Sequence, residues 1–95
     1  YIMEAAINKK EMKELFKAIT ALETEEETKK FLRDLCTLAE LKAISERWQV
    51  AKQINQNIPY RTIAKKTGSS TATITRVAHW LHHGTGGYRL MLHRL

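Results

Sequence analysis

The sequence predicts an all-α fold that contains a helix-turn-helix unit, and three observations support this prediction. The 95-residue chain has one proline and four glycines, and none of its segments alternates apolar and polar residues as a strand does. Apolar residues instead recur at helical spacing along most of the chain. Residues 58–76, IPYRTIAKKTGSSTATITR, have the pattern of two short helices joined by a tight turn. The length and the 43% of apolar residues predict one domain over residues 1–95.

The first two predicted helices carry their apolar residues on one side. The first spans about residues 8–22, and its apolar face comprises Met12, Leu15, Phe16, Ile19 and Leu22. The second begins at Thr24, because Thr24 and Glu27 have the spacing of a capping box. Its apolar side is formed by Phe31, Leu32 and Leu35.

The third predicted helix is the longest and runs to about Asn55. Thr37 and Glu40 repeat the capping pattern at its start. Its apolar positions at helical spacing are Leu41, Ile44, Trp48, Ala51 and either Ile54 or Asn55.

The helix-turn-helix unit is predicted over residues 58–83. Its first helix begins around Pro59 and ends before Gly68, and its second runs from Ser70 or Thr71 to His83. Gly68 supplies the positive φ of the turn, and Ala64 supplies a small residue where the two helices touch. The wedge between the helices is expected to be filled by Ile63, Ile74 and Val77, with Ala78 and Leu81 on the same face.

The last segment, residues 84–95, is predicted to be a glycine loop followed by a short helix. Gly84 stops the preceding helix, and Gly86 and Gly87 continue the loop. The short helix would carry Tyr88, Met91, Leu92 and Leu95 on one face.

The helices of residues 8–55 are predicted to form a homodimer. Their apolar residues exceed what a helix pair of this size can cover, and a second protomer is the natural partner for Phe16, Phe31, Leu32, Leu35, Leu41, Ile44 and Trp48. A two-fold pair of helix-turn-helix units also doubles the DNA contact. A compact monomer with a tight core is the alternative.

Charge is distributed unevenly along the chain. Residues 1–46 contain eight Lys/Arg and ten Asp/Glu, whereas residues 47–95 contain eight Lys/Arg and no carboxylate. Because the second half has no carboxylate side chain to form internal ion pairs, its positive field is left unscreened, which suits a phosphate backbone. The alternative is an ordinary basic surface.

The predicted DNA contacts lie on both helices of the unit. The start of the second helix enters the major groove in this motif, so hydroxyls and methyl groups there are the candidates for base edges and nearby phosphates. These residues are Ser69, Ser70, Thr71, Ala72, Thr73 and Thr75. Expected phosphate contacts are Tyr60, Arg61, Lys65 and Lys66. Residues 69–75 contain no Asn, Gln or Arg, the side chains that can read a base through two hydrogen bonds. We therefore expect water and DNA shape to contribute much of the sequence readout.

Catalysis, a cofactor and a metal site are not expected. No nucleophile–base pair or paired acids stand out, and His79 and His83, four residues apart, lack an evident third ligand unless His82 or His93 serves. Cys36 is the only cysteine, which excludes an internal disulfide, and is expected in the core. With neither a membrane span nor a signal-peptide core, the protein is expected in the cytoplasm. Its natural start is expected at Met3 or upstream.

The chain resembles the Trp repressor superfamily, and most closely its YerC/YecD-type members. The likeness runs from about Leu38 to Leu81 and is densest in Gly68–Arg76, where the run Ala-Thr-Ile-Thr-Arg is shared. The resemblance implies an intertwined, all-helical homodimer that binds a two-fold DNA site. The family's DNA contacts fall on Tyr60, Arg61, Ser70, Thr71, Ala72, Thr73 and Thr75.

The tryptophan pocket of that family does not carry over cleanly. Arg76 matches one pocket arginine, and Arg47 matches the other only if one residue is inserted before the turn. Val77 and Trp80 stand where the family has small residues, so the protein is expected to fill this pocket itself and not to use tryptophan as corepressor. A space for some other small molecule is the alternative.

The sequence therefore predicts a homodimeric, sequence-specific, DNA-binding transcriptional regulator, and we expect it to act as a repressor. Two alternatives stay open. One is a helix-turn-helix protein of replication or transposition, and the other is a protein-interaction module whose helix-turn-helix is vestigial.

Overall fold

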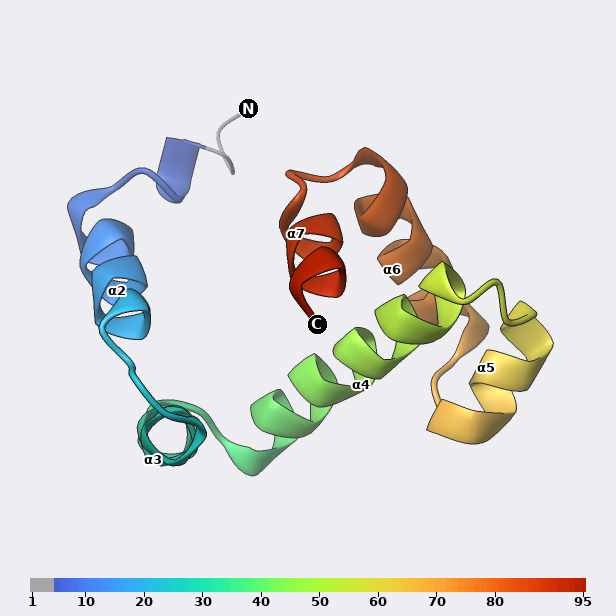
Figure 1. Ribbon diagram of the computed structural model, residues 1–95, viewed down its shortest axis with the longest axis horizontal. Helices are drawn as coiled ribbons and strands as arrows, with labels where there is room; N and C mark the ends of the chain where they lie inside the picture. Colours follow the sequence, from blue (N-terminus) through green and yellow to red (C-terminus); the bar gives the residue numbers. More distant parts are fainter. Residues whose placement is uncertain (1–4) are drawn as a thin grey trace. The chain divides into compact units, whose positions relative to one another are not determined.

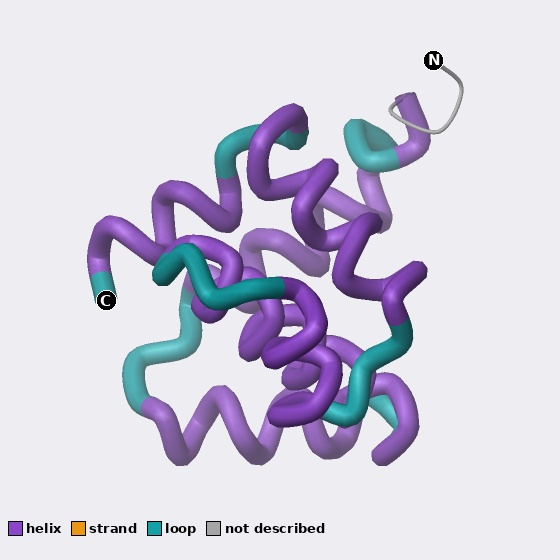
Figure 2. The backbone as a smooth tube through the Cα atoms, turned by 90° about the vertical axis from the view of Figure 1, so that its right-hand side faces the viewer, coloured by secondary structure: helices purple, strands orange, loops and turns teal. Residues whose placement is uncertain are grey.

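The computed structural model describes residues 5–95, so Met3 lies outside the described part. Between these limits the chain forms helices and loops and contains no strand (Figure 2). The helices are α2 (Lys10–Thr20), α3 (Glu25–Leu35), α4 (Leu38–Asn55), α5 (Tyr60–Thr67), α6 (Thr71–His83) and α7 (Gly87–Arg94). The predicted all-α class is confirmed, and α2 is shorter than expected at both ends. None of the helices over residues 5–95 is long and apolar enough to cross a membrane.

The chain divides into two units, residues 1–37 and residues 38–95. The first unit contains α2 and α3, and the second contains α4 to α7. The two units differ in how well each buries its own apolar side chains.

The capping predicted for the second helix is present in the first unit. The Thr24 hydroxyl accepts a hydrogen bond from the Glu27 N–H at 3.1 Å. The Glu27 carboxylate reaches back to the N–H of Glu23, at 3.0 Å, one residue before the N-cap. These two bonds fix the start of α3 by satisfying backbone donors that have no partner within a helix.

Despite its regular helices, the first unit has no core of its own within one chain. None of the residues of α2 or α3 is buried. Phe16 and Leu35 are 47% and 52% exposed, and Phe31 and Leu32 are half-buried. Cys36, expected in the core, is also only half-buried, because it caps the end of α3 next to a loop.

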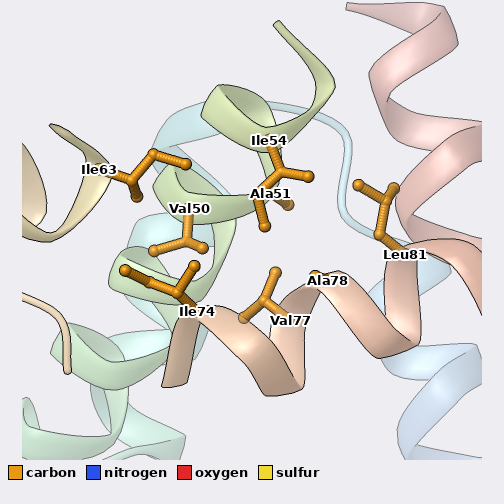
Figure 3. Packing of buried hydrophobic residues seen from close by; sticks show 8 residues of the cluster. All are labelled: Val50, Ala51, Ile54, Ile63, Ile74, Val77, Ala78 and Leu81. Atoms are coloured by element: carbon orange, nitrogen blue, oxygen red, sulfur yellow. The ribbon is translucent and has the colours of Figure 1, made fainter. Parts of the chain in front are cut away.

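The second unit has a closed apolar core built from three helices (Figure 3). Val50, Ala51 and Ile54 project from α4, and Ile63 from α5. The contribution of α6 is Ile74, Val77, Ala78 and Leu81. The predicted wedge of Ile63, Ile74 and Val77 is thus confirmed, with exposures of 0%, 0% and 1%.

Along α4 the core differs from the predicted face. Ile54 is buried and Asn55 is exposed, which resolves the alternative left open between them. Val50, which the spacing did not single out, is fully buried, whereas Ile44 is 45% exposed. The reason is that α5 and α6 pack on the C-terminal half of α4 (Figure 1). Within the unit, they cover the apolar residues of this half and leave those of the N-terminal half more exposed.

The turn between α5 and α6 has the conformation expected of it. Gly68 has a φ of +72°, and its N–H donates to the Ala64 carbonyl at 3.0 Å. Ala64 packs against the core, as predicted for the small residue at the helix contact. A side chain at Gly68 would be strained by this positive φ.

The C-terminal segment folds back onto the core of the second unit. At Gly84 a side chain is excluded, because a Cβ atom would lie 2.3 Å from the Trp80 carbonyl oxygen. Beyond the loop, Tyr88 and Leu92 of α7 pack against the core, while Met91 and Leu95 of the predicted face are 39% and 86% exposed. The helix is held further by Tyr88 stacked on Trp48, with ring centroids 6.4 Å apart, and by a hydrogen bond from Arg89 Nε to the Leu81 carbonyl.

Candidate nucleic-acid interface

The candidate site begins with the cationic and aromatic groups of α5. Pro59 is the N-cap, so Tyr60 and Arg61 occupy the first turn, and both side chains are exposed. Lys65 and Lys66 lie in the last turn and are exposed as well. All of the charged side chains of α5 are therefore free to meet an anion in solvent.

The second part of the site is the recognition tip, which we define as residues 70–75 at the start of α6. Ser70 is the N-cap, and its hydroxyl accepts a hydrogen bond from the Thr73 N–H at 3.2 Å. The Ser70 hydroxyl also bonds to Thr73 Oγ1 at 3.1 Å. Thr71, Ala72 and Thr75 are exposed, and Thr73 is half-buried. Small polar groups thus surround a helix N-terminus whose first backbone N–H groups favour an anionic partner.

One surface hollow brings the two parts together. It measures about 430 Å³ and is lined by residues of both helices: Tyr60, Arg61, Ala64, Lys65, Thr71 and Ile74. Three of the four predicted phosphate contacts, Tyr60, Arg61 and Lys65, therefore face one space together with the first residue of α6. Lys66 does not line this hollow, although it is exposed one residue further along α5.

Ser69 stands apart from the other candidate contacts. It is 7% exposed, and its Oγ is buried without a hydrogen-bond partner. The position predicted from the motif is next to the tip, but the side chain points into the protein. A contact from Ser69 to DNA would have to come from its backbone.

The charges of the site are not offset by carboxylates on its own helices. From Arg47 to the end, the sequence contains no Asp or Glu, so α5, α6 and α7 carry only neutral and basic side chains. A group of positive charges without neighbouring negative ones raises the local concentration of a polyanion and speeds its association.

The four residues considered for an effector pocket have different surroundings. Val77 is a core residue at 1% exposure, Arg47 is half-buried, and Arg76 is exposed. Trp80 is 47% exposed and lines a hollow of about 430 Å³ whose other walls are Trp48, Thr85, Gly87, Tyr88 and Met91. Within one chain, Trp80 is therefore not enclosed by protein.

The histidines form a surface pair on α6. The ring centroids of His79 and His83 lie 5.4 Å apart, and both residues are exposed. Over residues 5–95 no group of three or more His, Cys, Asp or Glu side chains is arranged to hold a metal ion.

One polar residue near the tip was not singled out from the sequence. Thr67, the last residue of α5, is half-buried and makes two hydrogen bonds through its hydroxyl. Its place directly before Gly68 was the available signal, because Ser and Thr hydroxyls often bond to backbone groups beside turns.

Comparison with known proteins gives consistent results. The family model described as Trp repressor protein matches residues 10–95. The uncharacterized protein YerC of Bacillus subtilis (strain 168) is 38% identical over 86 residues, which cover 90% of this chain and 83% of YerC. A crystal structure of a TrpR-like protein from Eubacterium eligens superposes with a TM-score of 0.91 at 38% identity, over 95% of this chain and 93% of that one. A crystal structure of a candidate Trp repressor from Staphylococcus aureus superposes with a TM-score of 0.90 at 43% identity, over 95% of this chain and 90% of that one.

Proposed function

The chain belongs to the Trp repressor family, and from this premise we propose that it is a homodimeric, sequence-specific DNA-binding transcriptional repressor. The observation that carries the proposal is the shared hollow of α5 and α6. Four exposed candidate contacts from two helices, Tyr60, Arg61, Lys65 and Thr71, face one space that has no carboxylate among its lining residues.

The proposed contacts divide into two roles. Tyr60, Arg61, Lys65 and Lys66 bind phosphates and orient the protein on the duplex. The tip reaches the base edges of the major groove through Ser70, Thr71, Ala72, Thr73 and Thr75, with Ser69 adding only backbone contacts. Since hydroxyl and methyl groups read bases weakly, bridging waters and DNA shape carry the remaining specificity.

The homodimer is supported by the uncovered apolar side chains of the first unit. Neither α2 nor α3 buries a single residue within one chain, yet both carry large apolar groups such as Phe16, Phe31 and Leu35. In the second unit, Ile44 of α4 is likewise an exposed apolar side chain. A second copy supplies the same surface in return, as a two-fold interface requires.

The proposal places the protein in the cytoplasm with the chromosome and gives tryptophan no role as corepressor. Val77, which lies in the core, and Trp80 occupy positions at which the family has small residues in its tryptophan pocket. The dimer is then competent to bind DNA without that amino acid.

A selection of duplexes from a random pool tests the proposal. Purified protein is expected to enrich a two-fold symmetric sequence, and light scattering is expected to report a dimer. Replacement of Arg61 and Lys65 by Gln should abolish the enrichment. The matched control is Lys13→Gln in α2, an exposed cation outside the helix-turn-helix, which should leave it unchanged.

The genomic location of the selected sequence separates the alternatives. Sites at promoters support a transcriptional repressor, whereas sites at replication origins or at the ends of mobile elements would favour the other helix-turn-helix functions. Failure to enrich any duplex would leave a protein-interaction module as the better description.

A further inference from the structure

The hydroxyl of Thr67 joins the end of α5 to the turn that follows it. Thr67 Oγ1 donates to the Ile63 carbonyl at 2.8 Å and accepts from the Ser69 N–H at 3.2 Å. A single half-buried side chain therefore uses both its donor and its acceptor capacity within the turn.

The turn has few other restraints at this point. The Gly68 N–H bonds to the Ala64 carbonyl at 3.0 Å, which fixes the peptide before Gly68. Gly68 has a φ of +72° and no side chain. Because glycine has more backbone freedom than any other residue, Gly68 itself does little to fix the orientation of the next peptide. The orientation of the Gly68–Ser69 peptide then depends on the bond from the Ser69 N–H to Thr67.

The side chain of Ser69 cannot replace that bond. Its Oγ is buried and has no hydrogen-bond partner, so it does not tether the turn. Ser69 directly precedes Ser70, the N-cap of α6, whose hydroxyl holds the first helical turn through Thr73. The direction in which the recognition tip leaves the turn is thus linked to the Thr67 hydroxyl.

We propose that Thr67 is a positioning residue that sets the sequence discrimination of the recognition tip. This inference rests on the proposed DNA binding. Base edges accept a hydroxyl only within a narrow range of distance and angle, whereas phosphates attract a cation over a longer range. Loss of the Thr67 bonds should therefore reduce the preference for the selected duplex more than it reduces binding to DNA in general.

Three variants test this role against the duplex obtained by selection and a scrambled duplex. Thr67→Val keeps the shape and removes both bonds, and Thr67→Ser keeps the hydroxyl. Thr62→Val makes the same chemical change on α5 at a hydroxyl that takes part in no hydrogen bond with the described residues. Thr67→Val is expected to lower the ratio of the two affinities about tenfold, which is the loss of about 1.4 kcal/mol of hydrogen bonding. The other two variants should stay within about twofold of the wild type. Circular dichroism at the assay temperature confirms that each variant is folded.

A folded Thr67→Val protein that retains the wild-type ratio would overturn the inference, and so would an equal loss in Thr67→Ser. If Thr67→Val does not fold, amide hydrogen exchange in the wild-type protein decides instead. Strong protection of the Ser69 N–H relative to the Thr71 N–H supports the bond, because the latter lies in the first helical turn. Equal exchange of the two would refute it. Failure of the wild type to prefer any duplex is a separate result, which removes the proposed function and this inference with it.

Discussion

The two units of the chain are built from similar helices but reach stability in different ways. In residues 38–95, side chains of α4, α5 and α6 close a core in which Ile63, Ile74 and Val50 are completely buried. In residues 1–37, the helices are as regular and α3 has a side-chain N-cap, yet none of the residues of α2 or α3 is buried. Regular helices with an apolar face therefore do not by themselves indicate an intramolecular core.

The units also differ in charge. Residues 1–37 contain seven Lys/Arg and eight Asp/Glu, whereas residues 38–95 contain nine Lys/Arg and two Asp/Glu. A nearly neutral surface with exposed apolar groups suits association with a second protein chain, and a strongly basic one suits a polyanion. The difference supports our proposal that the first unit mediates assembly and the second binds DNA, and each part of the proposal can be tested separately.

The largest expected effect concerns the basic unit. With about three or four contacts per protomer, a dimer neutralises roughly six to eight phosphates, so the slope of log affinity against log salt should lie near about −5 to −7. Between 50 mM and 200 mM salt the affinity should then fall by about three to four orders of magnitude. Fluorescence anisotropy with the selected duplex measures this slope. A slope shallower than about −2 on every duplex tried would remove the DNA-binding role from this unit.

The second prediction concerns assembly. Trp48 is half-buried in the single chain, where it stacks on Tyr88, and we expect the partner to cover the rest. Trp48→Ala should cost about 3–5 kcal/mol, and folding and dimerisation should be lost together. Denaturant titration and light scattering on the same samples provide the measurement.

A pair of smaller truncations separates the two units in that experiment. Ile63→Ala removes a side chain that is already buried in one chain, so its destabilisation of about 2–5 kcal/mol should not depend on an interface. Leu35 is 52% exposed, and Leu35→Ala should destabilise the protein by more than about 1 kcal/mol only if a partner covers it. A wild-type protein that is folded and monomeric at micromolar concentration would contradict the assembly role of the first unit.

The third prediction divides the basic unit itself. Thr73→Ala or Thr75→Ala should relax sequence preference by about 1 kcal/mol, the size of one ordinary hydrogen bond, because these residues lie in the recognition tip. Lys65→Ala or Lys66→Ala should weaken binding to all duplexes by a similar factor and reduce the salt slope by about one. Affinities for the selected duplex and for single-base variants of it distinguish the two patterns. The division of roles would be wrong if the lysine changes altered base preference and the threonine changes did not.

The helix-turn-helix was predictable because its determinants are local in sequence. Ile63, Gly68 and Ile74 lie within a dozen residues, and each has one physical requirement, burial or a positive φ, that few residue types meet. The candidate contacts on the outside of the unit follow once its inner face is known. This is why Arg61 and Lys65 were predicted from the sequence and lie together around one hollow.

Features that depend on distant packing were not predictable. Val50 and Ile44 are both apolar residues of α4, and only the placement of α5 and α6 decides that the first is buried and the second is not. Burial of the Ser69 hydroxyl likewise results from the way the turn closes against the core, which its polar character does not indicate. The two hydrogen bonds of Thr67 depend on the same closure.

The smallest expected effect is that of free tryptophan, for which we predict neither a heat of binding nor a change in DNA affinity. In the related repressor, a bound indole sets the spacing of the two recognition helices. Here Val77 is buried in the core. The second of the two pocket positions carries Trp80, which lines an apolar hollow with Trp48 and Tyr88. At positions 77 and 80 this chain lacks the small residues that leave room for an indole in the family, and only one of the two pocket arginines is clearly matched, by Arg76. Calorimetry with tryptophan, together with duplex binding in its presence and absence, checks this expectation. A micromolar heat of binding that also tightened DNA binding would show that Val77 and Trp80 leave the pocket open, and it would transfer part of the control of the basic unit to a small molecule.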